Sequence, residues 1–181
     1  MTTNTNPFNV IGQLAALRRY ARSLVRNPDE AEDLVHDALI RALERRSTFK
    51  SSGSIRNWLM SILHNTHIDR LRRERAANRR QDAAVELADI VAPAGQEYSV
   101  RLAQVRDAFL SLPEDQREAL HLVAIEELSY QEAADVLNIP VGTLMSRVSR
   151  ARARLRAMES GEDANLVPHL RIVGGNPDDQ Q

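Results

Sequence analysis

The chain has 181 residues, 43% of them hydrophobic and 27% charged, with a formal net charge of −1. This apolar fraction is typical of globular proteins and excludes a wholly disordered chain, while the absence of cysteine excludes disulfide scaffolds, thiol catalysis and cysteine-ligated metal sites. No run approaches the roughly 18 apolar residues of a membrane span and the polar start is no signal peptide, so we expect a soluble, cytoplasmic protein without membrane insertion.

The near-zero net charge hides a segregation of charge along the chain. Residues 70–80 contain six arginines and one acid, and residues 147–156 contain five arginines and no acid. Residues 29–37 carry five acids and residues 81–98 carry four, with no basic residue in either segment. Lys50 is the only lysine among the 24 basic residues. Two separate basic stretches indicate anion contacts at two places, although solvated helix faces and arginine-favouring codon usage would give the same pattern.

The apolar pattern predicts helices nearly throughout, with no strand-like alternation. Asn27 and Pro28 are a typical start for a helix over 28–46. Its apolar stripe consists of Ala31, Leu34, Val35, Ala38, Leu39 and Ala42. The opposite face carries Asp33, His36, Asp37, Ile40 and Glu44. An isoleucine ringed by acids indicates a protein-docking patch, but single exposed apolar residues are also common on solvated faces.

A small-residue loop over 50–54 precedes the next long helix, for which Ser54 can serve as the cap. The apolar stripe is Ile55, Trp58, Leu59, Ile62 and Leu63, so Trp58 is predicted to lie in the core rather than to stack on bases. The polar face presents Asn57, Ser61, His64 and Asn65, and the first arginine cluster follows. Together these features can hold single-stranded DNA with one base turned out of the stack. His64 and His67 lack a convergent carboxylate or cysteine, so we expect no metal site.

The strongest local signal lies at residues 129–156, after a non-periodic segment over 81–98 that predicts a linker. Ser129 and Glu132 have capping-box spacing, and a tight turn at 138–140 joins a short helix to a longer one. The positions predicted to face inward are Tyr130, Ala133, Ala134, Leu137, Leu144, Val148, Ala151 and Leu155. This spacing is typical of a helix-turn-helix, whose second helix can enter a major groove.

The outward face of that second helix favours DNA contact. It carries Gly142, Thr143, Ser146, Arg150 and Ala153, flanked by Arg147 and Arg154. Small residues let the backbone approach DNA, and arginines reach guanine edges or phosphates. The alternative is an ordinary helical hairpin with a solvated basic face. The sequence contains no nucleophile elbow, phosphate-binding glycine loop or His-Glu-x-x-His motif, so we expect no catalytic residues, no enzyme and no cofactor.

From about Phe8 to Met158 the sequence resembles the extracytoplasmic-function sigma factors of the sigma-70 family. Three ordered pieces carry the resemblance: NPDEAEDLVHDALIRALERRSTF, then KSSGSIRNWLMSILHN with HIDRLRRE, then LPEDQREALHLVAIEELSYQEAADVLNIPVGTLMSRVSRARARL. The resemblance implies an all-α fold of two small helical domains. These are a region 2 bundle over 8–80 and a region 4 helix-turn-helix domain over 100–159. A flexible acidic linker over 81–99 joins them, and a disordered tail over 160–181 follows.

The resemblance also implies the function and the sites. A sigma factor binds core RNA polymerase and promoter DNA and directs transcription initiation at specific promoters. Contacts with polymerase would come from Asp33, His36, Asp37 and Ile40. The −10 element, with one flipped base, would be bound by Phe49, Lys50, Ser51, Ser52, Ser54, Ser61, His64 and Asn65. The −35 element, expected to be GGAAC-like, would be read by Thr143, Met145, Ser146, Arg147, Ser149 and Arg150.

The segments ILHN and TLMSRVSRAR resemble the alphaproteobacterial general-stress, EcfG-like subgroup. This implies a stress response under control of a small anti-sigma protein, NepR, which the response regulator PhyR removes. The alternative is a sigma-like decoy module that binds an anti-sigma protein without promoter recognition, although the arginines of the recognition helix are intact. A helix-turn-helix repressor would need a dimer interface, and the sequence has no heptad stretch.

Overall fold

The computed structural model describes residues 8–78 and 97–159. Every regular element in these residues is helical, which confirms the all-α prediction. The elements are η1 (Ile11–Gln13), α1 (Leu14–Leu24), α2 (Pro28–Glu44), η2 (Arg46–Thr48), α3 (Ile55–Asn78), α4 (Glu97–Ser111), α5 (Glu114–Ala124), α6 (Tyr130–Leu137) and α7 (Val141–Glu159). The expected tail lies outside the described residues, and so does the expected linker except for residues 97–99, which begin α4.

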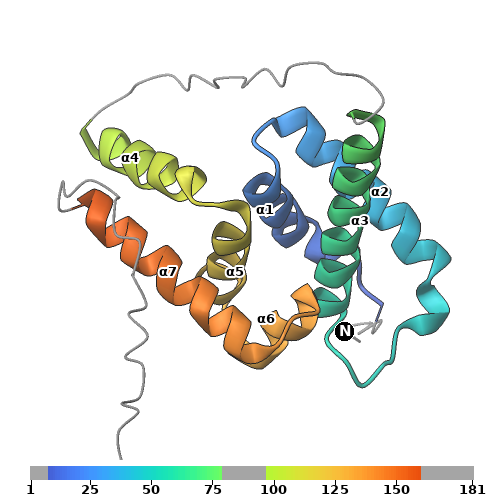
Figure 1. Ribbon diagram of the computed structural model, residues 1–181. Coiled ribbons are helices and arrows are strands. Elements are labelled where there is room, and N and C mark those ends of the chain that lie inside the picture. Colours follow the sequence, from blue (N-terminus) through green and yellow to red (C-terminus); the bar gives the residue numbers. More distant parts are fainter. Residues whose placement is uncertain (1–7, 79–96, 160–181) are drawn as a thin grey trace, which may run out of the picture.

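Helices α1–α3 form one group, here called the N-terminal module (8–78), and α4–α7 form another, the C-terminal module (97–159). Figure 1 shows the two groups beside each other, with α5 and α6 on the side that faces the N-terminal module. Helix α5 packs against α1, and α6 packs against α3. No described helix has both the length and the apolar character needed to cross a membrane. The contact between the modules therefore determines which surfaces of α1 and α3 stay accessible.

Local signals account for the helices of the N-terminal module. The Asn27 side chain accepts hydrogen bonds from the backbone N–H groups of Asp29 (2.8 Å) and Glu30 (3.4 Å), with Pro28 in the first turn of α2. The predicted stripe of α2 is buried, apart from the half-buried Leu39. Trp58 lies in an aromatic cluster, with ring centroids 5.8 Å from Phe8 and 5.4 Å from Phe49. Trp58 is half-buried and packs against the core, as the apolar stripe predicted in part.

The helix-turn-helix of the C-terminal module also follows from local signals. Ser129 and Glu132 form the predicted capping box, and Asn138 turns the chain between α6 and α7 with a φ of 51°. The predicted inward residues of α7 are buried, except for the half-buried Leu155. The inward prediction for Tyr130 is wrong, because its side chain is 37% exposed. Tyr130 is the first residue of α6. Because side chains in a helix tilt towards its N-terminus, the side chain of Tyr130 extends past the start of α6 and remains exposed.

Candidate nucleic-acid and polymerase interfaces

The outer face of α2 forms an exposed acidic and apolar patch. Asp33 and His36 are exposed, and Ile40 is 46% exposed. Leu43, one helical turn after Ile40, is 64% exposed and enlarges the apolar part beyond what the sequence pattern had indicated. Asp37 is half-buried because its carboxylate lies 2.6 Å from Nη2 of Arg70 on α3. We call this surface, Asp33 to Leu43 on its outer side, the α2 patch.

The loop before α3 is exposed from Lys50 to Ser54. The N–H of Gly53 donates to the carbonyl oxygen of Lys50 at 2.8 Å, which closes a tight turn. The hydroxyl of Ser54 accepts the N–H of Asn57 at 3.3 Å and so caps α3, as predicted. The ring of Phe49 is half-buried against Phe8 and Trp58. The loop is therefore anchored by Phe49 at one end and by the start of α3 at the other.

The remaining residues predicted to contact the −10 element do not lie together on one exposed surface. Asn65 is exposed, but His64 is only 8% exposed and its Nδ1 lies 2.6 Å from Oε1 of Glu118 on α5. Ser61 donates to the carbonyl oxygen of Trp58 at 2.8 Å. Asn57 donates to Glu132 of α6 at 3.0 Å. Much of the polar face of α3 thus meets the C-terminal module rather than solvent.

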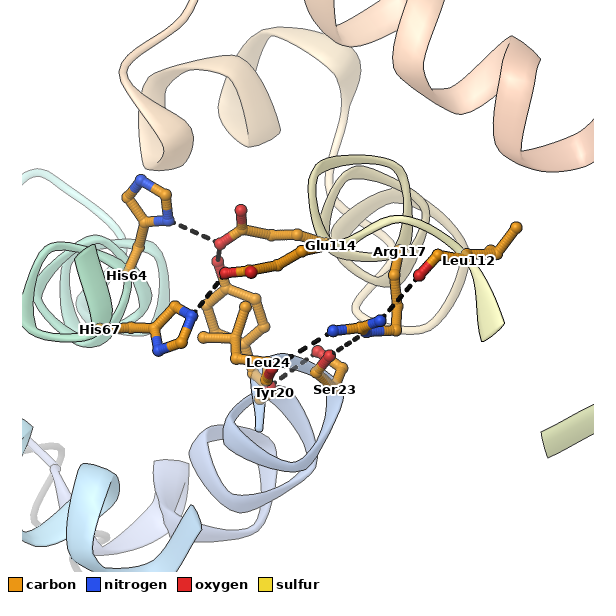
Figure 2. A network of polar contacts seen from close by, with 9 residues as sticks. Tyr20, Ser23, Leu24, His64, His67, Leu112, Glu114 and Arg117 are labelled. Atoms are coloured by element: carbon orange, nitrogen blue, oxygen red, sulfur yellow. Dashed lines mark hydrogen bonds and ion pairs between the residues drawn. The ribbon is translucent and has the colours of Figure 1, made fainter. Parts of the chain in front are cut away.

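Helix α5 holds the modules together through buried polar groups (Figure 2). The hydroxyl of Tyr20 donates to Glu118 at 2.5 Å, and Nε2 of His67 lies 2.6 Å from Oε1 of Glu114. Burial, followed by the charge of Glu118, raises the pKa of the Tyr20 phenol well above its ordinary value. The hydrogen bond with His67 lowers the pKa of Glu114.

Arg117, on the same helix, is 6% exposed, and backbone carbonyl groups accept its hydrogen bonds. Its guanidinium donates to the carbonyl oxygens of Ser23 and Leu24 at the end of α1, and to those of Leu110 and Leu112 beside α5. Burial lowers the pKa of Arg117 from its usual range. Backbone carbonyls from both modules thus satisfy one buried cation (Figure 2).

Glu126, just after α5, is a second point of contact. Its side chain is fully buried, with Arg19 Nε of α1 at 3.1 Å and His121 Nε2 at 3.3 Å, and it also pairs with Arg56 of α3. Burial alone would raise the pKa of Glu126, but the hydrogen bonds from His121, Arg19 and Arg56 outweigh it and lower the pKa to about 2. Glu126 is therefore ionised at neutral pH.

A cavity of about 620 Å³ lies between α3 and the C-terminal module. Its lining includes His64, Asn65, Arg72, Arg75, Glu118 and Arg147. Residues predicted to bind the −10 element and one predicted to read the −35 element therefore border the same space. His64 and His67 pair with different glutamates, and the described part of the chain contains no cluster of three or more potential metal ligands.

The outward face of α7 is accessible. Ser146, Ser149 and Arg150 are exposed, and Met145 is 53% exposed. Ser146 donates to the carbonyl oxygen of Gly142 at 2.9 Å, and Nε of Arg150 donates to the carbonyl oxygen of Ser146 at 3.3 Å. Thr143 is half-buried, and Arg147 lies 3.5 Å from Asp115 of α5. The predicted −35 residues thus share one helix face, apart from Arg147, which leans towards the cavity.

Glu126→Gln should change stability in a pH-dependent way. A carboxylate whose pKa falls from 4.5 to about 2 on folding stabilises the folded state fully above pH 4.5, and this stabilisation is lost as the pH falls towards 2. We expect E126Q to lower the urea midpoint most near neutral pH, and the difference from the parent to narrow below pH 4.5. Glu127→Gln, at an exposed neighbour, is the control. A difference that does not vary with pH would contradict the ion-pair account.

Comparison with known proteins places the chain in a family. Residues 13–77 match sigma-70 region 2, and residues 102–155 match sigma-70, region 4. The ECF RNA polymerase sigma factor EcfG of Rhodopseudomonas palustris is 34% identical over 93% of this chain and 94% of its own length. The ECF sigma factor SigW of Bacillus subtilis is 34% identical over 72% of this chain and 75% of its own.

Solved structures agree with this assignment. The sigma factor RpoE of Bartonella quintana, solved in complex with the anti-sigma factor NepR, has 35% identity and a TM-score of 0.73 over 83% of this chain and 93% of its own. The PhyRSL–NepR complex of Sphingomonas sp. Fr1 shares the fold, at 21% identity and a TM-score of 0.58. The pairing of regions 2 and 4, with relatives that match nearly end to end, shows that this chain belongs to the extracytoplasmic-function sigma factors of the sigma-70 family.

Proposed function

We propose that this sigma factor uses three separate surfaces to bring core RNA polymerase to stress-response promoters. The α2 patch docks on polymerase, the loop and polar face of α3 hold the −10 strand, and the outward face of α7 reads the −35 duplex. The observation that carries the proposal is the accessible face of α7, where small and basic side chains line one side of the recognition helix. The protein needs no catalytic chemistry for this role and acts in the cytoplasm.

The −35 assignment is supported by the geometry of α7. Ser146 and Ser149 are too small to keep the helix backbone away from a groove floor, and Arg150 beside them reaches outward. Met145 offers an apolar contact of the kind that suits a thymine methyl group. The left-handed conformation of Asn138 turns the chain between α6 and α7 and thereby helps to present this face.

The −10 assignment is supported by the loop before α3. Lys50 to Ser54 are exposed and include small serines that leave room for an extruded base, and Asn65 is exposed further along α3. Arg72, Arg73 and Arg75 continue along α3 as exposed cations for the DNA backbone. We assign the polymerase and −10 contacts to the expected domain 8–80 and the −35 contacts to the expected domain 100–159.

Anti-sigma control is proposed from the relative solved with NepR and from unused apolar surface. Leu102 and Val105 on α4 are 69% and 60% exposed, and Met158 on α7 is 38% exposed. Exposed large apolar side chains on neighbouring helices mark a protein contact. We assign these side chains and the α2 patch to a NepR-like anti-sigma protein, which would compete there with polymerase.

Run-off transcription with purified core polymerase tests the function. We expect the chain to give promoter-dependent transcripts from a template with a GGAAC-like −35 element, because it carries both of the surfaces that we propose for DNA contact. A decoy module is the second candidate, favoured by the fold it shares with the PhyRSL complex. Binding to a NepR-like protein without any transcript would identify the chain as a decoy and overturn the proposed function.

Arg150→Ala should weaken −35 recognition by about 1–3 kcal/mol, the usual cost of losing an arginine contact to a base, and Ser146→Ala should weaken it less. The measurement is binding of the variant holoenzyme to promoter DNA with and without the −35 element. Arg106→Ala is the control, because it removes an equal charge from α4, where Arg106 pairs with Asp107. If R106A and R150A weaken binding equally, the loss reflects charge alone and the base contact is refuted.

Asp33→Lys should abolish binding to core polymerase and leave the fold intact. Asp33 is exposed and lies at the N-terminal end of the α2 patch, so reversal of its charge changes the docking surface, and the free energy of unfolding should change by about 0.5 kcal/mol or less. Co-elution with core polymerase and thermal unfolding are the two measurements. Asp135→Lys makes the same reversal on the exposed side of α6 and should still bind. Loss of binding together with loss of stability would show instead that Asp33 is structural.

A further inference from the structure

Three aromatic side chains of the N-terminal module form a cluster beside the loop before α3, here called the aromatic cluster (Phe8, Phe49 and Trp58). The ring centroids lie 5.9 Å apart for Phe8 and Phe49, 5.8 Å apart for Phe8 and Trp58, and 5.4 Å apart for Phe49 and Trp58. The ring planes are inclined to one another by between 54° and 60°. Tilted arrangements of this kind are favourable for aromatic pairs, because the edge of one ring meets the face of the next. Each ring therefore supports both of the others.

Phe8 connects the two ends of the loop over 50–54. Phe49 directly precedes this loop, and Trp58 lies in the first turn of α3, which follows it. The guanidinium of Arg46, three residues before Phe49, lies 4.8 Å from the centroid of the Phe8 ring, within the range of a cation–π contact. Phe8 thus contacts residues on both sides of the loop.

The backbone around Phe8 is held by the start of the first helices. The N–H of Val10 donates to the carbonyl oxygen of Phe8 at 3.1 Å, and the side chain of Asn9 accepts the N–H of Gly12 at 3.0 Å. Val10 is half-buried and packs against the core. The ring of Phe8 is therefore a support that is fixed to the body of the N-terminal module.

The composition of the loop gives it little stability of its own. Four of its five residues are serine or glycine, and all five are exposed. Exposed serine and glycine side chains contribute little burial, and glycine has more backbone freedom than any other residue. Anchors at the two ends therefore determine how much conformational freedom the loop still has to lose when it binds a base.

We infer that Phe8 is a positioning residue of the −10 site. Its ring ties Phe49 to the start of α3 and thereby holds the loop over 50–54 in the conformation that takes up the extruded base. The inference rests on the proposed −10 site and adds a residue that lies before the segment matching sigma-70 region 2. Phe8 acts through Phe49 and the loop, without itself touching DNA.

Substitutions at Phe8 separate positioning from a general effect on folding. Phe8→Ala removes the ring, and Phe8→Leu keeps an apolar side chain without a ring. Phe8→Tyr keeps the ring and is the conservative variant that should restore function. Val25→Ala is the control, because Val25 is also half-buried against the core but follows the opposite end of α1.

The emission of Trp58 reports the aromatic cluster directly, because Trp58 is the only tryptophan in the chain. In the free chain, F8A should shift the emission maximum to longer wavelength and make Trp58 easier to quench with acrylamide, since one neighbouring ring is lost. F8Y and V25A should both keep the emission of the parent. Thermal unfolding of the same samples measures the stability that each substitution costs.

Strand opening and −35 binding are measured with the holoenzyme that each variant forms with core polymerase. Permanganate footprinting of unpaired thymines on the run-off template follows opening, and a short duplex that carries only the GGAAC-like element reports −35 binding. We expect F8A to lower opening about two- to tenfold, the range expected for the loss of one aromatic contact. Binding to the −35 duplex should stay within about twofold of the parent, because distant sites contribute independently. F8L should lower opening less than F8A, and F8Y should open the promoter as the parent does.

Three results would overturn the inference. The first is normal opening by F8A, which would show that the loop does not depend on the ring. The second is an equal loss of opening and of −35 binding, because a merely structural role lowers both together. The third is unchanged Trp58 emission in F8A, which would show that the cluster holds without Phe8.

The parent chain keeps this inference distinguishable from the proposed function. A parent that opens no promoter would refute the proposed function and the inference together. A parent that opens promoters equally well with and without the Phe8 ring would refute the inference alone.

Discussion

The guanidinium of Arg117 lies buried between the two modules and donates to backbone carbonyl oxygens of both. Ser23 and Leu24 stand at the end of α1, where the last carbonyls of a helix lack partners and carry partial negative charge. A buried cation without such acceptors would be costly, so the end of α1 must lie against α5 for this charge to be satisfied. Glu114 and Glu118 flank Arg117 on α5, so the packing of α5 against α1 also brings these two glutamates next to α3.

Helix α3 therefore makes contacts in both modules. Leu59, Ile62 and Leu63 pack into the core of its own module, while His64 and His67 meet glutamates of the other. This second set of contacts is polar, and beside it the ring of Tyr20 stacks on that of His121 in α5, with centroids 5.5 Å apart. A ligand that binds more tightly when the two modules are separated therefore raises the affinity of any other ligand with the same preference, and the effect is reciprocal.

Much of the fold could be predicted from the sequence, because local signals determine it. Asn27, Ser129 and Asn138 act within one helical turn, and apolar periodicity alone identified the buried faces of α2 and α7. The exposure of the α2 patch and of α7 also followed, since a face opposite a buried stripe is exposed unless another element covers it.

The polar contacts between the modules could not be predicted in the same way. Glu118 and Tyr20 are 98 residues apart, and Glu126 and Arg19 are 107 apart. Charged residues this far apart in the sequence produce no periodic pattern from which their pairing could be predicted. The sequence correctly placed His64 on the polar face of α3, yet it gave no sign that this face meets α5. Within the −10 set, the loop and Asn65 were open as expected, and His64 was not.

Nearly all basic residues of the chain are arginines, and this has a practical consequence at the loop before α3. Lys50 is the only lysine in the chain and lies exposed in that loop. Guanidinium groups stay protonated and resist acylation, whereas a lysine amine can be acetylated. An acylating enzyme or reagent acting on side-chain amines would therefore modify one position, and would neutralise the single cation of the loop without touching the eleven arginines of the two basic stretches. For the same reason, the extent to which Lys50 is acylated would report whether that loop is covered by a ligand. Mass spectrometry can measure this acylation in a chain without substitutions.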